Sequence, residues 1–167
     1  LETSNQDSAA LQKENTSKLI IDNVPNSAGS LTATAMDTYI STETGGKGVL
    51  AWGAGIGGGA NQMGSNIFIN GGTITASSSI GAGIGGGGYK GGDGEKITIN
   101  GGIITAKSGN GAGIGGGEQC CGSKITIENG FVTADSAFGA GIGGGGNGCG
   151  SNITINKGTI TADSSSG

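Results

Sequence analysis

The heptapeptide Gly53-Ala54-Gly55-Ile56-Gly57-Gly58-Gly59 returns three more times along the chain, beginning at Gly81, Gly111 and Gly139. The starting points of the four copies are 28, 30 and 28 residues apart. The residues between the copies are also regular, because the string from Asn66 to Ala76 recurs in related form at 96–106, 124–134 and 152–162. A fixed period of this length predicts stacked structural units, each too small to bury a core alone.

The strings between the copies alternate apolar and polar residues with a period of two, which is typical of β-strands. In the repeat beginning at Lys96, the pattern predicts one strand that buries Ile97 and Ile99 and a second, after a glycine corner, that buries Ile104. The glycine run predicts a third strand that buries Ile114. Three short strands per repeat describe one coil of a triangular, single-stranded parallel β-helix, an all-β solenoid for which we expect right-handed coiling.

Aligning the repeats gives about 4.5 coils of 28–30 residues, beginning near residues 18, 66, 96, 124 and 152. Residues 18–167 are therefore predicted to form the β-helix, and residues 1–17 an N-terminal cap or linker in which 4–14 form a short helix. The sequence stops within a repeat, so we expect it to be part of a longer protein. The inward columns are Leu19/Ile67/Ile97/Ile125/Ile153, Ile21/Ile69/Ile99/Ile127/Ile155, Leu31/Ile74/Ile104/Val132/Ile160 and Ile56/Ile84/Ile114/Ile142.

The composition excludes several functional classes. The 167 residues include 41 glycines, but these do not fall at every third position as in collagen, and the regular isoleucines argue against disorder. The chain contains no histidine and no arginine, so histidine-based catalysis and bidentate phosphate clamps are excluded. A net charge of -4 with scattered lysines argues against a nucleic-acid partner, and no apolar stretch is long enough for membrane insertion. We predict no catalytic residue, cofactor or metal ligand, and therefore no enzyme.

Two polar columns lie at the first corner of each coil. Asp22, Asn70, Asn100, Glu128 and Asn156 form the first, and their spacing predicts side chains that bond to the backbone along the stack. The next column contains Gly71, Gly101, Asn129 and Lys157. Because glycine and asparagine dominate it, we expect a left-handed backbone conformation there.

Cys121 and Cys149 occupy the same position in successive coils. Stacking would place their Cα atoms about 4.8 Å apart, within the range that a disulfide tolerates. Cys120 would then be left over. A bond between the adjacent Cys120 and Cys121, or a fully reduced set of three thiols, remains the alternative.

The third strand of each coil suggests a binding surface. Gly55, Gly83, Gly113 and Gly141 are expected to point outward and form a flat, bare face, unless glycine is required there only by a tight backbone. Trp52, Ile80, Asn110 and Phe138 border this face. Large apolar side chains beside a flat face indicate an interaction site, with partial burial at the corner as the alternative.

Other motifs give weaker signals. The glycine runs lack the lysine and hydroxyl residue of a phosphate loop, and Gly91 to Glu95 does not recur as a calcium-binding repeat would. Asp135 and Asp163 stack one coil apart, as two carboxylates of a glycosidase could, but isolated solvated residues explain them better. Thr73-Ile74-Thr75 and Thr159-Ile160-Thr161 are the Thr-x-Thr strands that ice-binding solenoids display, although Ile103 and Phe131 interrupt the outward column.

The strings Ile97-Thr98-Ile99-Asn100-Gly101-Gly102 and Gly-Ala-Gly-Ile-Gly-Gly-Gly resemble glycine-rich β-helix repeats of large surface proteins of anaerobic Gram-positive bacteria. The resemblance covers about residues 18–163. It implies an extracellular, non-catalytic segment at the cell surface or secreted, an adhesin that binds or presents to a host protein, such as an immunoglobulin or a mucin-like glycoprotein, or a glycan. A structural spacer without a ligand, and an ice-binding solenoid, remain the alternatives.

Overall fold

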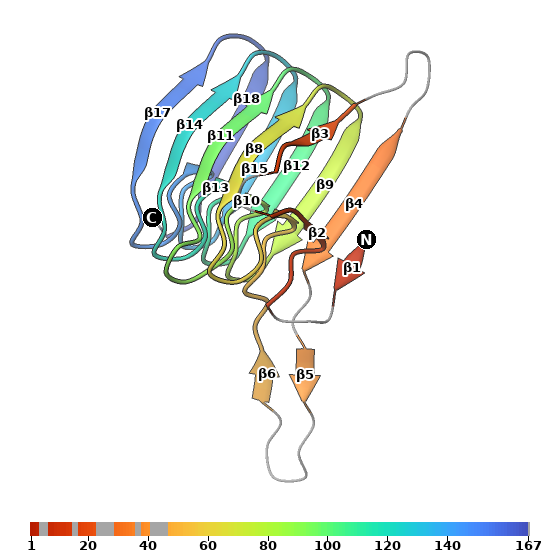
Figure 1. Ribbon diagram of the computed structural model, residues 1–167. Coiled ribbons are helices and arrows are strands. Elements are labelled where there is room, and N and C mark those ends of the chain that lie inside the picture. The colour runs from red at the N-terminus through yellow and green to blue at the C-terminus, as the bar shows by residue number, and fades with distance from the viewer. Residues whose placement is uncertain (4–6, 15–16, 23–28, 36–37, 41–46, 167) are drawn as a thin grey trace.

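The computed structural model describes residues 1–3, 7–14, 17–22, 29–35, 38–40 and 47–166, and every regular element in this part of the chain is a β-strand. The strands build three parallel sheets along one stack, which is a parallel β-helix of about four turns (Figure 1). We call the three sheets A, B and C, with the strands given below. Each complete turn supplies one strand to sheet C, then one to sheet A and then one to sheet B. The predicted fold class is confirmed.

The strands of the three sheets are as follows. Sheet A contains β1 (Glu2–Thr3), β4 (Ser30–Ala35), β9 (Thr73–Ser78), β12 (Ile103–Ser108), β15 (Phe131–Ser136) and β18 (Thr159–Ser164). Sheet B contains β2 (Leu11–Gln12), β7 (Ile56–Gly57), β10 (Ile84–Gly85), β13 (Ile114–Gly115) and β16 (Ile142–Gly143). Sheet C contains β3 (Leu19–Ile21), β8 (Gly64–Ile69), β11 (Gly94–Ile99), β14 (Gly122–Ile127) and β17 (Gly150–Ile155).

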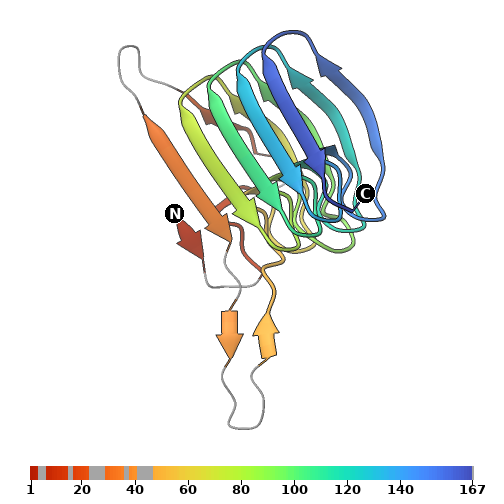
Figure 2. The same cartoon turned by 180° about the vertical axis from the view of Figure 1, so that it is seen from behind.

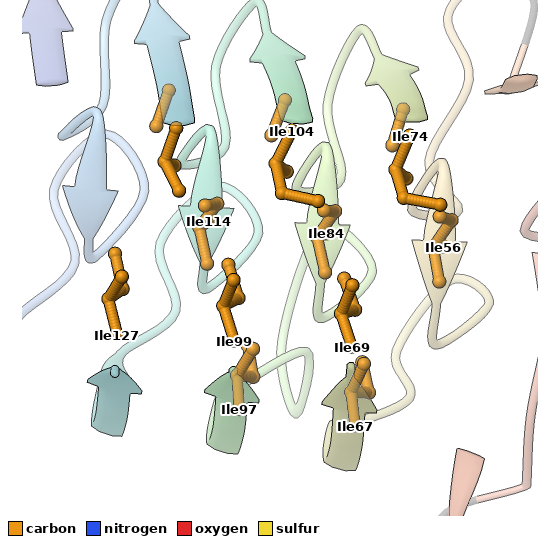
Figure 3. Packing of buried hydrophobic residues seen from close by; sticks show 14 of the residues in the cluster. Ile56, Ile67, Ile69, Ile74, Ile84, Ile97, Ile99, Ile104, Ile114 and Ile127 are labelled. Atoms are coloured by element: carbon orange, nitrogen blue, oxygen red, sulfur yellow. The ribbon is translucent and has the colours of Figure 1, made fainter. Parts of the chain in front are cut away.

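The register along the stack is the one that the repeats predict. Ile99 pairs with Ile69 on one side and Ile127 on the other, and Ile127 pairs in turn with Ile155. Figure 3 shows the resulting rows of isoleucines in the bore, to which all three walls contribute and sheet C contributes both the row of Ile67 and Ile97 and the row of Ile69 and Ile99. In the middle turns these side chains are fully buried, whereas Ile155 in the last turn is half exposed because no further coil covers it.

From β8 onward, each strand of sheet C begins two residues earlier than the alternation indicates and contains one residue with a left-handed backbone. That residue is Asn66 (φ 58°) in β8 and Lys96 (φ 53°) in β11. It is skipped in the pairing, since Glu95 pairs with Ser65 and Ile97 with Ile67. The column therefore bends sheet C without breaking its ladder.

The left-handed residue at the first corner lies one position later than predicted. The positive φ angles occur at Gly72, Gly102, Gly130 and Gly158, with values from 91° to 125°. In these four turns the position is always glycine, which can adopt such angles without strain. Lys157, which precedes Gly158, is therefore not an exception to the pattern.

The N-terminal segment does not form the predicted capping helix in its described residues. Instead β1 pairs with β4 in sheet A and β2 pairs with β7 in sheet B, so the segment starts the β-helix before sheet C begins. The backbone amide of Lys13 continues this attachment by donating to the carbonyl of Gly57 at 2.9 Å. The segment around Pro25 lies outside the described residues.

A β-hairpin leaves the stack between sheets A and B of the first complete turn. Its strands, β5 (Thr38–Ile40) and β6 (Lys47–Val49), pair antiparallel and project away from the β-helix (Figures 1 and 2). The sequence analysis did not predict this element. The spacing of the repeats contained a signal for it, because Gly53 lies 20 positions after Ala33, whereas Gly111 lies five positions after Ala106.

Candidate functional site

The third wall of the β-helix, formed by sheet B and the glycine runs, is closed rather than bare. Gly55, Gly83, Gly113 and Gly141 are all buried. A Cβ atom at Gly113 would lie 2.7 Å from the carbonyl oxygen of Gly141 and 2.8 Å from the amide nitrogen of Asp135 in β15. The expectation that these four glycines form an outward, flat docking face is therefore wrong.

The glycines are buried because the third wall packs directly against the backbone of sheet A. A Cβ at Gly55 would lie 2.6 Å from the amide nitrogen of Ser77, and one at Gly83 would lie 2.7 Å from that of Lys107. Real Cβ atoms do not approach backbone so closely. Of the two explanations that the sequence left open, tight backbone packing accounts for the glycine column.

A row of serines fastens sheet A to this glycine wall. The hydroxyl groups of Ser78, Ser108 and Ser136, the last residues of β9, β12 and β15, donate to glycine carbonyl oxygens one coil earlier. For Ser136 the acceptor is Gly111, at 2.7 Å, and its hydroxyl also accepts from the amide of Gly139, at 2.8 Å. This row was not predicted, although a serine ends the sheet A strands β9, β12, β15 and β18.

The column of Trp52, Ile80, Asn110 and Phe138 lies at the corner where sheet A leads into the glycine run. The loop that follows each glycine run folds over this column. The amide of Gly88 donates to the carbonyl of Trp52 at 2.6 Å. The same bond recurs one coil later, from Glu118 to Ile80 at 3.0 Å, and again from Gly146 to Asn110.

A second column of larger side chains runs beside the first. Asn61, Tyr89, Gln119 and Asn147 follow the glycine runs at equivalent positions, and all have positive φ angles, from 59° to 71°. The backbone bonds between coils place this column next to the one that contains Trp52. We call the two columns together the corner surface: Trp52, Ile80, Asn110, Phe138, Asn61, Tyr89, Gln119 and Asn147.

The corner surface contains a pocket at its N-terminal end. The pocket has a volume of about 370 Å³ and is lined by Asp7, Trp52, Ala60, Asn61 and Tyr89. The rings of Trp52 and Tyr89 meet edge to face, with centroids 5.7 Å apart and an angle of 85° between their planes. Residues that carry two aromatic rings, one carboxylate and one amide thus line this small volume.

A second pocket, of about 360 Å³, lies further along the same surface. It is lined by Asn110, Glu118, Phe138, Gly146, Asn147 and Ser166. The amide of Asn110 donates to the Glu118 carboxylate at 3.2 Å, while the ring of Phe138 is 60% exposed. The column predicted from the sequence therefore supplies Trp52 to the first pocket and Asn110 and Phe138 to the second. The sequence did not indicate Tyr89 and Glu118, which belong to the variable loops after the glycine runs, or Asp7.

Ile80, which lies between the two pockets in the column, is not part of an exposed border. Its side chain is 3% exposed. The loop above it passes so closely that a Cβ at Gly88 would lie 2.4 Å from the Ile80 Cγ2 atom. The prediction of an exposed border is therefore wrong for Ile80, to which the alternative of burial at the corner applies, and Ile80 packs beneath the loop between the two pockets.

The disulfide between Cys121 and Cys149 is present, with a Cα–Cα distance of 4.5 Å. It links the loops before β14 and β17 and so joins two successive coils. Cys120 is a buried free thiol, and its Sγ lies 2.9 Å from the carbonyl oxygen of Tyr89. Burial, as the largest effect, raises the pKa of this thiol.

The polar column at the first corner bonds through side chains rather than to the backbone as predicted. The amide of Asn100 donates to the side-chain oxygen of Asn70 at 2.6 Å, and the amide of Asn156 donates to the Glu128 carboxylate at 2.8 Å. Asn70 likewise donates to Asp22. These exposed bonds link neighbouring coils, so the column has a structural role.

The two stacked aspartates have an ion-pair neighbour. Asp135 pairs with Asp163 in the sheet register, and its carboxylate lies 3.4 Å from the Lys107 ammonium in the coil before. Within the described residues, no group of three or more cysteine, aspartate or glutamate side chains could hold a metal ion. The same part of the chain contains no helix that is long and apolar enough to cross a membrane.

The outer face of sheet A carries an unbroken threonine column. Thr32, Thr75, Thr105, Thr133 and Thr161 pair in register from β4 to β18. The neighbouring column begins each strand and includes Ile103 and Phe131, whose side chains are 54% and 64% exposed. The outer face of sheet A therefore combines a row of threonines with an exposed apolar patch at Ile103 and Phe131.

Comparison with known proteins agrees with the architecture. A family model described as a beta helix repeat matches residues 69–88, 97–118 and 125–146. Neither the curated proteins nor the solved structures gave a match. Each matched stretch begins near the end of a sheet C strand or within it and continues through sheets A and B, so the chain carries β-helix repeats of the kind that this family model describes.

Proposed function

We propose that this β-helix is a non-catalytic extracellular segment of a bacterial surface protein that binds a host protein, such as an immunoglobulin or a mucin-like glycoprotein, or a glycan. The corner surface is the observation that carries the proposal. It holds two pockets of similar size on one edge of a rigid stack, each with an aromatic ring beside polar side chains. Aromatic residues surrounded by polar groups are typical of binding sites.

The disulfide supports the extracellular location. Disulfides persist in oxidising environments, whereas reducing compartments keep thiols free. The bond between Cys121 and Cys149 staples two coils immediately next to the corner surface. A segment outside the cell would benefit from such a link, because its fold must resist unfolding without chaperones.

A binding assay against immobilised immunoglobulins, mucins and a glycan array tests the proposal. We expect binding that is lost in Trp52→Ile, which introduces the residue of the next coil, and in Phe138→Ala. Phe131→Ala is the matched control, since Phe131 on sheet A is 64% exposed and Phe138 is 60% exposed. The proposal fails if nothing on the panel binds, or if Phe131→Ala and Phe138→Ala reduce binding equally.

Ice binding is the second candidate, and the threonine column on sheet A favours it. Five threonines in register form a regular row of hydroxyl and methyl groups. The adjacent column is interrupted by Ile103 and Phe131, which is why we place this function second. A thermal-hysteresis measurement decides it, since zero activity excludes ice binding. A spacer without ligands would instead show no binding on any panel, together with strong protease resistance.

A further inference from the structure

We propose that the pocket formed by Asp7, Trp52, Ala60, Asn61 and Tyr89 binds an alkylammonium cation, either a quaternary ammonium group or the ammonium group of a lysine side chain. The inference rests on the proposed binding role of the corner surface and adds the chemical class of its ligand. It depends on three features of the pocket: the ring geometry, the charge of the lining and the state of the backbone donors.

The ring geometry suits a compact cation. Trp52 and Tyr89 stand almost perpendicular, at 85°, and both line the pocket. In an edge-to-face pair, the ring that presents its edge keeps both its faces free of its partner. The faces of aromatic rings carry the negative end of the ring quadrupole and attract ammonium groups, tryptophan most strongly. A sugar ring, by contrast, stacks flat on a single open aromatic face.

The charge of the lining has the matching sign. Asp7 carries a carboxylate, and no lysine is among the described residues that line the pocket. The backbone carbonyl of Asp7 accepts a hydrogen bond from the amide of Ala60 at 2.7 Å, which holds Asp7 at the rim. A carboxylate beside two aromatic rings adds a direct attraction for a cation.

The backbone of the pocket does not favour an anion. Anion sites use backbone N–H groups that point at the ligand. Here the amide of Ala60 donates to Asp7, the amide of Asn61 to Gly88 at 3.1 Å, and the amide of Tyr89 to Glu118 at 3.2 Å. These donors are already used between coils, so the side chains determine which ligand binds.

The chain provides its own probe, because Trp52 is its single tryptophan. Tryptophan fluorescence is titrated with choline and, in parallel, with the neutral isostere of choline in which a quaternary carbon replaces nitrogen. We expect a saturable change with choline and about five-fold weaker binding of the isostere. Titrations with a lysine peptide and a trimethyllysine peptide distinguish a protein source of the cation from a small-molecule source.

Two variants locate the interaction. Asp7→Asn removes the charge and is expected to weaken choline binding about three-fold. Tyr89→Asn removes one ring without disturbing the backbone, since Asn61 and Asn147 have similar positive φ angles, and should weaken binding about five-fold. Asp163→Asn, which makes the same charge change on sheet A, should leave binding unchanged, and circular dichroism verifies the fold of each variant.

The proposal is overturned if choline produces no saturable change, if the neutral isostere binds as well as choline, or if Asp7→Asn and Asp163→Asn have equal effects. Its failure is distinguishable from that of the proposed function. Binding of choline without binding of any host protein or glycan would remove the proposed function and leave the cation pocket. If a host molecule binds, choline does not inhibit that binding and choline does not change Trp52 fluorescence, the proposed function stands and the cation pocket is ruled out.

Discussion

Sheets A and C differ from the glycine wall in what holds them together. Apart from the short β1 and β3, sheets A and C use six-residue strands whose inward isoleucine, valine and alanine side chains fill the bore. Sheet B has two-residue strands. Around them, glycines without side chains allow close backbone packing, which contributes alongside the buried isoleucines. There the backbones of successive coils and of sheet A approach so closely that most glycines have no room for a Cβ atom.

This difference shows that a repeat can encode two kinds of packing. The alternating residues specify which side chains are buried, and a small change in their size leaves a cavity. The glycine run specifies how closely backbones approach, and any added carbon must displace the main chain. We therefore expect substitutions at the glycines of this wall to be less tolerated than substitutions at the alternating residues of sheets A and C.

The largest expected effect is that of Gly115→Ala. The new Cβ would lie 1.9 Å from the carbonyl oxygen of Gly143, at a backbone φ of 138°. We expect a loss of more than about 4 kcal/mol in the free energy of unfolding, measured by denaturant titration. The matched control is Gly101→Ala, whose Cβ would meet nothing nearer than 3.7 Å, with an expected change within about 0.5 kcal/mol. Equal effects of the two substitutions would contradict the contrast between the walls.

Removing bulk from the aliphatic walls should cost less than adding one carbon to the glycine wall. Ile99→Ala deletes a fully buried side chain and is expected to lower the free energy of unfolding by about 3 kcal/mol. Its neighbour Thr98 points to the other face of the same strand, so Thr98→Ala should cost less than about 1 kcal/mol. An Ile99→Ala protein less stable than Gly115→Ala would reverse the ranking.

Removing a serine hydroxyl that links sheet A to the glycine wall should lower the free energy of unfolding by less than either Gly115→Ala or Ile99→Ala. Ser136→Ala removes the hydroxyl that donates to Gly111 and accepts from Gly139. We expect a loss of about 1–2 kcal/mol in thermal or chemical unfolding, because the partner groups stay buried. Thr133→Ala, on the outer face of the same strand, serves as the comparison. If both substitutions have the same small effect, the serine row does not fasten the walls.

The smallest effect concerns Cys120, a thiol buried in the loop that follows the glycine run. Its pKa is raised by burial, so the folded protein holds the thiol proton more tightly than the unfolded chain does. The contribution of the Cys120 thiol to the free energy of unfolding is fully present below the ordinary thiol pKa. It is lost as the pH rises through the raised pKa of the folded protein. Unfolding measured from neutral to alkaline pH should therefore decline less steeply in Cys120→Ala than in the parent protein. Parallel curves would contradict this explanation.

The aliphatic walls were predictable from the sequence because inward alternation has a direct signature. Ile69, Ile99, Ile127 and Ile155 stack as their spacing indicates. Glycine has no such signature, since the same residue serves an outward bare face, a left-handed corner or a close backbone approach. For that reason the predicted outward direction of Gly113 was wrong, and the column with positive φ angles was predicted one residue too early.

The corner surface was predictable only in part, for a similar reason. Trp52 and Phe138 stand out in a chain with 4% aromatic residues, so their position before the glycine run was informative. Tyr89 and Asp7 lie in segments that do not repeat regularly, and only the fold brings them to Trp52. The burial of Ile80 depends on the path of the Gly88 loop, which no residue pattern describes.

The in-register stack is tested most directly by locating the disulfide. The protein is purified without reductant and its free thiols are alkylated under denaturing conditions, after which the linked peptides are sequenced by mass spectrometry. We predict a link between Cys121 and Cys149, with Cys120 alkylated; the link should persist in Cys120→Ala and disappear in Cys121→Ala. A bond between Cys120 and Cys121, or a link from Cys120 to Cys149, would contradict the register on which every wall of this β-helix depends.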